Sequence, residues 1–218
     1  MQLYEELFLL ALNDQKGEVS SAVVTILGFG LSGAILSELV LAGKIGLDDE
    51  KHMVVLNSEL IGDELLDEAF TRIAEASRPR KTSYWINRLS ESVKKLQRRV
   101  GMGLVEKGVL QLEEKRFLWV IPYEAFPQVD ASAKYWVKQS LRQVVLAGEK
   151  AEARSIALLG LVRACEMLEF VFTRDELKSA RNKIDQLTID DEIGAGIRLA
   201  IEAIEAAAVA AAMTATAG

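Results

Sequence analysis

A cluster of basic residues is the feature of this sequence with the clearest chemical meaning. Its members are Lys94, Lys95, Arg98 and Arg99. Residues three or four apart share a face of an α-helix, so these side chains would present their charges together. Clustered cations attract phosphate groups, and each adds about 1 kcal/mol of attraction to an anionic membrane. A helix face that is merely solvated has the same pattern, so that interpretation stays open.

The charge balance singles out the same part of the chain. Residues 72–116 hold 12 Lys or Arg against 5 Asp or Glu, a local balance of +7 within a chain of net charge −6. The remainder therefore carries −13. An acidic chain as a whole is no general polyanion binder, so any anionic ligand is expected at the basic third.

The other reactive side chains do not assemble into a catalytic or metal site. His52 is the one histidine and Cys165 the one cysteine, which excludes a structural zinc site and an internal disulfide. Residues 63–68 form an acidic cluster of the kind that begins a helix. No nucleophile, base and orienting group can be combined. We therefore expect no enzymatic activity, no metal and no cofactor, with His52 at the surface and Cys165 buried.

Three glycines, Gly28, Gly30 and Gly33, match the G-x-G-x-x-G pattern of dinucleotide-binding loops. Such a loop needs a preceding strand and several alternating strands and helices, whereas the chain after residue 56 is almost continuously helical in pattern. The favoured interpretation is that small residues let two helices approach closely.

A long amphipathic helix is predicted over residues 87–107, followed by a β-hairpin at about residues 109–121. Residues 109–112 and 117–121 read as its strands, with Lys115 and Arg116 in the turn. Phe117, Leu118 and Trp119 begin an apolar run that is longer than a half-exposed strand needs. The strand is either buried, inserted in a membrane interface, or paired with another subunit.

A helix with a basic face followed by a hairpin is also the order of a winged-helix nucleic-acid reader. DNA-binding domains usually have a basic overall balance, and the isoelectric point here is about 5.1. This alternative therefore ranks second.

The remaining pattern predicts a mainly α protein with one globular domain over residues 1–218 and an alanine-rich helix at about residues 194–214. Residues 19–37 carry no charge, but their Gly, Ser and Thr content favours a buried helix over a membrane span. Acids at positions 5 and 6 do not suit a signal peptide, and the single cysteine suits a reducing compartment. A cytoplasmic location is expected.

Four blocks in order, residues 3–12, 30–34 with 38–45, 62–68 and 104–110, resemble the Golgi phosphoprotein 3 family. The resemblance implies a mostly helical domain that docks on the cytosolic face of a membrane, the Golgi in eukaryotes, by binding phosphatidylinositol 4-phosphate. It also implies an adaptor role toward membrane-protein cargo, and a hairpin associated with membrane contact and subunit pairing. About ten residues present in eukaryotic relatives are absent after residue 85, which indicates a prokaryotic or divergent member.

The family pocket consists of one tryptophan and three arginines. The positions that match those arginines are Ser32, Lys94 and Gln97, and the tryptophan falls near residues 22–23. The resemblance therefore predicts a headgroup site at Ser32, Lys94, Lys95, Gln97, Arg98 and Arg99, in which Arg98 and Arg99 substitute for the family arginines. A lysine is a point charge and lacks the forked contact that an arginine makes to phosphate.

Overall fold

The computed structural model describes residues 1–91, 93–117, 120–148, 151–189 and 195–216, and it is mainly helical with two small antiparallel sheets. The predicted fold class is confirmed. The helices are α1 (Leu3–Ala11), α2 (Leu27–Leu41), α3 (Glu64–Ala74), α4 (Thr82–Ser90), α5 (Val93–Glu106), α6 (Ser132–Arg142), α7 (Ala153–Ala164), α8 (Leu168–Val171), α9 (Arg174–Ile189) and α10 (Ala195–Thr216), with a π-helical turn, η1 (Gln143–Ala147), after α6. The strands are β1 (Ile45–Leu47), β2 (His52–Val55) and β3 (Arg80–Lys81) in one sheet, and β4 (Glu113–Phe117) and β5 (Ile121–Ala125) in the other.

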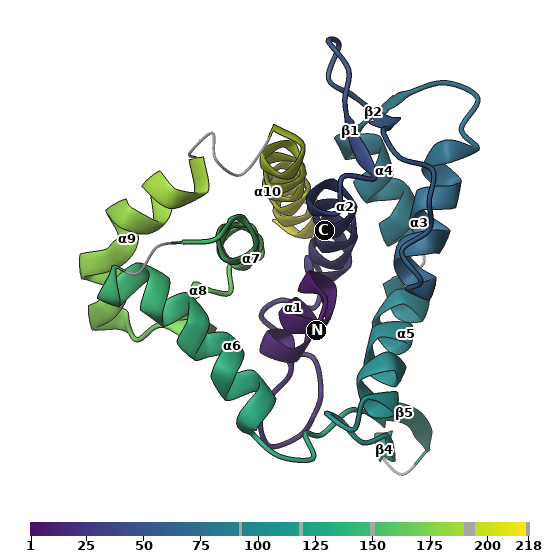
Figure 1. The fold of residues 1–218 in the computed structure, drawn as a ribbon. Helices are drawn as coiled ribbons and strands as arrows, with labels where there is room; N and C mark the ends of the chain where they lie inside the picture. The colour runs from purple at the N-terminus through teal and green to yellow at the C-terminus, as the bar shows by residue number, and fades with distance from the viewer. Residues whose placement is uncertain (92, 118–119, 149–150, 190–194, 217–218) are drawn as a thin grey trace.

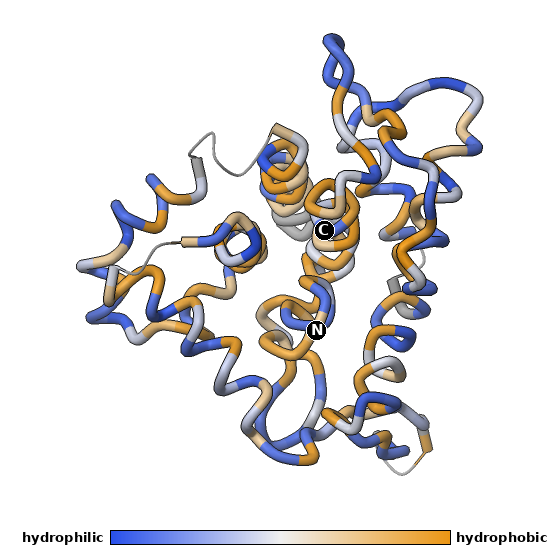
Figure 2. The backbone as a smooth tube through the Cα atoms, viewed as in Figure 1, coloured by the Kyte–Doolittle hydropathy of each residue, from blue (hydrophilic) through white to orange (hydrophobic). Residues whose placement is uncertain are grey.

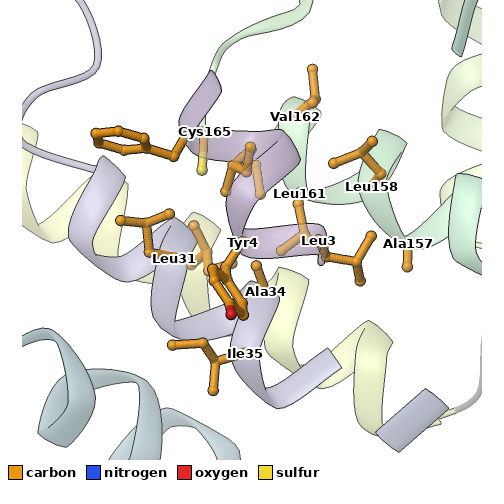
Figure 3. Packing of buried hydrophobic residues seen from close by; sticks show 14 of the residues in the cluster. Leu3, Tyr4, Leu31, Ala34, Ile35, Ala157, Leu158, Leu161, Val162 and Cys165 are labelled. Atoms are coloured by element: carbon orange, nitrogen blue, oxygen red, sulfur yellow. The ribbon is translucent and has the colours of Figure 1, made fainter. Parts of the chain in front are cut away.

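Helix α2 lies at the centre of the molecule. It contacts α1, α3, α4, α5, α7 and α10, and Figure 1 shows α3, α4 and α5 on one side of it with α6, α8 and α9 on the other. Glu38 is its one charged residue, and a helix that is apolar all round is a buried one. Residues 19–37 are thus helical and buried from Leu27 onward, while residues 21–26 form turns. Figure 3 shows how side chains of α1, α2 and α7 meet in this core.

The glycines of α2 serve close helix packing. A Cβ atom at Gly30 would lie 2.4 Å from the Sγ atom of Cys165, and one at Gly33 would lie 2.4 Å from the Cδ1 atom of Ile204 on α10. The Gly30 amide donates to the Ile26 carbonyl within the helix, so it is not free to cradle a phosphate. The helix-packing interpretation is the one that the structure supports, and the dinucleotide interpretation is wrong.

The predicted hairpin is present, but its turn lies about four residues later in the chain than predicted. Glu113 to Phe117 form strand β4, and Phe117 pairs with Ile121 at the distal end of the ladder. Residues 109–112 lie outside the named strands, although Leu110 bridges Gln128 in the same register. Leu110 is buried and fixes this register, so the polar residues 113–116 form a half-exposed strand instead of a turn. Lys115 and Arg116 therefore lie in β4.

The helix predicted over residues 87–107 is divided into α4 and α5. Leu96, Val100 and Leu104 are buried as the spacing predicted, and Gly108, at φ +70°, ends the helix. The C-terminal helix α10 agrees with the predicted range to within two residues.

A partly buried ion-pair network joins α1, α2 and α7. Glu38 accepts a hydrogen bond from the Leu3 amide and another from Arg154 on α7, at 2.7 Å. Arg154 also lies 3.5 Å from Glu6, whose pKa is raised by burial although the guanidinium opposes the shift. The Glu38 side chain is only 8% exposed, so its charge depends on these partners in place of water.

A second ion pair makes the free energy of unfolding depend on pH in the acid range. Glu176 accepts hydrogen bonds from Arg142 and from the Thr173 amide, which lower the pKa of its carboxyl from 4.5 to about 2. A carboxylate whose pKa is lower in the folded chain stabilises the fold above its unfolded pKa, and this contribution disappears as the pH falls through the folded value. We predict that Glu176→Gln reduces the loss of stability between about pH 4.5 and about pH 2. Urea unfolding of the wild type and of Glu176→Gln across this pH range measures the loss of stability. Identical pH profiles for the two would contradict the prediction.

Candidate functional site

The predicted site residues do not form one site. Ser32 is fully buried in α2, and its hydroxyl donates to the Gly28 carbonyl at 2.9 Å. It cannot reach a ligand at the surface, so its assignment to the headgroup site is wrong. The backbone of Lys94 belongs to α5, but its side chain lies outside the part of the chain that the structure describes.

The four other residues divide between two sides of α5. Gln97 and Arg98 line a pocket toward the β4–β5 hairpin, whereas Lys95 and Arg99 line a pocket toward α3. Arg98 and Arg99 also meet at a third pocket, of about 390 Å³, which they line together with Glu64 and Lys107. Figure 2 shows hydrophilic and hydrophobic residues interspersed along α5.

The hairpin-side pocket has a volume of about 450 Å³, and its two carboxylates, Glu18 and Glu124, outnumber its one cation, Arg98. The Nε atom of Arg98 lies 2.9 Å from both carboxylate oxygens of Glu124. Across the pocket, the Tyr123 hydroxyl donates to Glu18 at 2.9 Å, and this hydrogen bond raises the pKa of the phenol. The buried Nε2 atom of Gln97 finds no hydrogen-bond partner among the described residues. An acceptor group entering this pocket would satisfy it.

The α3-side pocket is smaller, about 220 Å³, and richer in cations. Arg99 donates to Glu68 and, at 2.8 Å, to Glu64, while Arg72 donates to Glu68 at 2.7 Å. Burial alone would raise the pKa of Glu68, but the hydrogen bonds from Arg99 and Arg72 lower it, so this carboxylate is ionised. Lys95 completes the lining as a third cation.

Arg72 lines this pocket although it is not among the residues predicted for the headgroup site. It is four residues after Glu68 on α3, a spacing that the sequence shows. Its nearness to α5 depends on how the two helices pack around the pocket, which the sequence does not show. The available signal was its place at the start of the basic segment 72–116.

The hairpin residues are partly engaged with the rest of the chain. The Lys115 Nζ atom donates to the Lys16 carbonyl at 2.9 Å, and Arg116 is exposed on β4. The backbone of Phe117 lies in β4, whereas Leu118 and Trp119 lie outside the described residues. Val120, the described residue before β5, is 77% exposed. An apolar group therefore does project at the end of this hairpin.

The isolated reactive residues behave as expected. His52 is partly exposed between Asp48 and Glu50, at 3.5 Å and 3.6 Å. Cys165 is buried, and burial raises the pKa of its thiol to about 12, which leaves it protonated and unreactive. Within the described ranges, no group of acidic, histidine or cysteine side chains has the arrangement of a metal site. Nor does any described helix combine the length and the apolarity that crossing a bilayer requires.

The comparisons with known proteins agree on one family. The family model described as Golgi phosphoprotein 3 matches residues 3–215. Vacuolar protein sorting-associated protein 74 of Eremothecium gossypii is 30% identical over 166 residues, which are 67% of this chain and 49% of that protein. The protein of the same name from Schizosaccharomyces pombe is 29% identical over 165 residues, 66% of this chain and 48% of the relative. The chain thus spans about half the length of the curated relatives it matches.

Proposed function

The chain belongs to the Golgi phosphoprotein 3 family, and from this premise we propose that it is a peripheral membrane protein that binds anionic phospholipid. Its role is binding, not catalysis, and its partners are an anionic lipid surface and membrane-protein cargo for which it acts as an adaptor. In a eukaryotic cell the membrane would be the cytosolic face of the Golgi. A second copy of the chain, paired through the β4–β5 hairpin, is a further partner.

The observation that carries this proposal is the row of cations along α5. Lys95 and Arg98 are exposed, Arg99 is half-buried, and Arg116 on the nearby hairpin is exposed as well. Each cation held close to an anionic leaflet contributes roughly 1 kcal/mol of attraction. The projecting end of the hairpin, where Val120 is exposed, adds an apolar group that suits the membrane interface.

A headgroup resembling that of phosphatidylinositol 4-phosphate is the finer part of the proposal. The family positions at Ser32 and Gln97 supply no cation, and Ser32 is inaccessible. Contacts to phosphate therefore fall to Arg98 or Arg99 and their neighbours, because a guanidinium makes the forked contact that a phosphate accepts.

The winged-helix alternative has weaker support. Arg98 and Arg99 would lie on its recognition helix, yet they pair with Glu124 and with Glu64 of the same chain. A duplex would have to displace these carboxylates, as a lipid phosphate would, and the net charge of −6 further opposes binding to an extended polyanion.

Charge reversal on α5 tests the proposal. We predict that the combined substitutions Lys95→Glu and Arg98→Glu weaken binding to phosphatidylserine vesicles at least about tenfold, since each reversal removes an attraction and adds a repulsion. The measurement is co-sedimentation at low salt, where screening is weak.

Lys178→Glu is the matched control, because Lys178 is 79% exposed on α9, away from the cations of α5. Equal binding by the wild type and the double variant would remove α5 from the membrane surface. A gel-shift titration completes the comparison, and binding of duplex DNA tighter than binding of vesicles would favour the nucleic-acid alternative.

A further inference from the structure

The pocket between α3 and α5 has the composition of a phosphate site. Its rim carries Arg72, Lys95 and Arg99 with the single carboxylate of Glu68, and buried Ile35 and Leu96 lie among its apolar lining residues. Figure 1 shows α3 and α5 as neighbouring helices on the same side of the molecule. A pocket of about 220 Å³ accommodates a phosphate group with a few attached atoms, and not a large ligand.

The charge of the lining is unbalanced. Three cations face one carboxylate, which leaves a surplus of two positive charges. Counting Glu64, which pairs with Arg99 from outside the pocket and is 90% exposed, still leaves one. A concave, partly apolar site with a surplus of one sign concentrates ions of the opposite sign.

Glu68 occupies the place that a bound anion would take. Its two oxygens accept from different arginines, Oε1 from Arg72 and Oε2 from Arg99. The carboxylate thus joins the two guanidinium groups as a bridging anion would. A phosphate monoester carries more negative charge and more acceptor oxygens than a carboxylate, so it competes for the same donors.

We propose that this pocket binds a phosphate monoester group through Arg72, Lys95 and Arg99, and that Glu68 is an internal counterion which the ligand displaces. The ligand is either a lipid headgroup or a free soluble phosphate ester. The inference deepens the proposed function by locating the phosphate contact, and it rests on that function only if the source is a lipid.

The other side of α5 offers an internal comparison. Arg98 is the one cation lining the hairpin-side pocket, where Glu18 and Glu124 outnumber it. Removing one carboxylate from each pocket is the same chemical change in two different electrostatic settings. Of these two pockets, the α3-side pocket is the one lined by three cations, and its cations outnumber its carboxylates.

Isothermal titration with glycerol 3-phosphate tests the soluble arm. Glu68→Gln should tighten binding at least about threefold, because the competing counterion is gone while the donors remain. Arg72→Gln should weaken binding about tenfold, since a hydrogen bond to a charged group is lost. Glu124→Gln is the matched control and should leave the affinity unchanged. Equal effects of Glu68→Gln and Glu124→Gln, or no effect of Arg72→Gln, would overturn the inference.

Vesicles distinguish the source of the phosphate. The lipid arm compares phosphatidylinositol 4-phosphate, which has a phosphate monoester, with phosphatidylserine at equal surface charge. If Glu68→Gln and Arg72→Gln change binding only to the phosphoinositide vesicles, the pocket binds a lipid headgroup. If they change binding to glycerol 3-phosphate and to neither vesicle, the pocket binds a soluble ester and the membrane proposal loses this support. If the wild type binds both vesicles and no pocket variant matters in any assay, the pocket inference fails and the membrane proposal stands.

Discussion

Replacing Gly17 by alanine is expected to lower the free energy of unfolding by about 4 kcal/mol, which is a large effect for one methyl group. Gly17 has φ +67°, and a Cβ atom there would lie 2.1 Å from the backbone nitrogen of Pro127. Its carbonyl also accepts a hydrogen bond from the Phe126 amide at 2.7 Å. The backbone of residues 126–127 therefore cannot move away without breaking the contact that joins the loop after α1 to the end of the hairpin.

Gly108 supplies the matched control for this prediction. It has φ +70°, but a Cβ atom there would meet nothing within 4 Å. Gly108→Ala should lose only the cost of the left-handed conformation, about 1 to 2 kcal/mol. Urea unfolding of both variants measures the difference. Similar losses for the two would show that the approach of Gly17 to Pro127 is not tight in solution.

Removing the charge at Glu38 is the second prediction with a large expected effect. Glu38→Leu keeps most of the side-chain volume but leaves Arg154 without its nearest carboxylate and the Leu3 amide without an acceptor. Arg154 is 35% exposed and keeps Glu6 at 3.5 Å, so the cost is below that of a fully buried pair, about 2 kcal/mol. Glu38→Gln retains an acceptor oxygen and should lose less than Glu38→Leu, because only the charge is removed.

Thermal or urea unfolding gives the comparison, with Asp175→Asn as the control. Asp175 pairs with Lys178 at 3.1 Å, but both side chains are almost fully solvated, so its loss should change stability by less than about 0.5 kcal/mol. A Glu38→Leu variant as stable as Asp175→Asn would mean that Arg154 finds water or Glu6 equally well. The network would then contribute little to the junction of α1, α2 and α7.

The central helix could be predicted because its signal is local. An apolar and small-residue stretch with a single carboxylate has no polar face, so burial on all sides follows from composition. The spacing of Leu96, Val100 and Leu104 gave the buried side of α5 in the same manner. Both inferences need only the period of a helix and the preference of apolar side chains for the core.

The hairpin register could not be predicted because it depends on a distant partner. Charged residues at 113–116 are compatible with a turn or with an exposed strand, and the sequence pattern does not separate the two. Burial of Leu110 and its bridge to Gln128 decide the register, and this is a tertiary contact.

The candidate site shows the same limit more strongly. Helical spacing placed Arg98 and Arg99 together as one basic stripe, but it carried no information about the neighbouring elements. Glu124 comes from β5 and Glu68 from α3, so the two arginines pair with different elements, although both line the pocket that also holds Lys107. The resemblance likewise assigned Ser32 to a headgroup site, whereas the core around α2 encloses it.

The close contact between Gly30 and Cys165 makes the reaction rate of this thiol a measure of how often the core opens. The thiol is fully buried, and its pKa of about 12 keeps it protonated while the core is closed. A reagent can reach the sulfur only when the core around Cys165 opens, so the rate of its reaction follows the frequency of that opening. Because the chain has one cysteine, each thiol modification reports an opening of the core at Cys165.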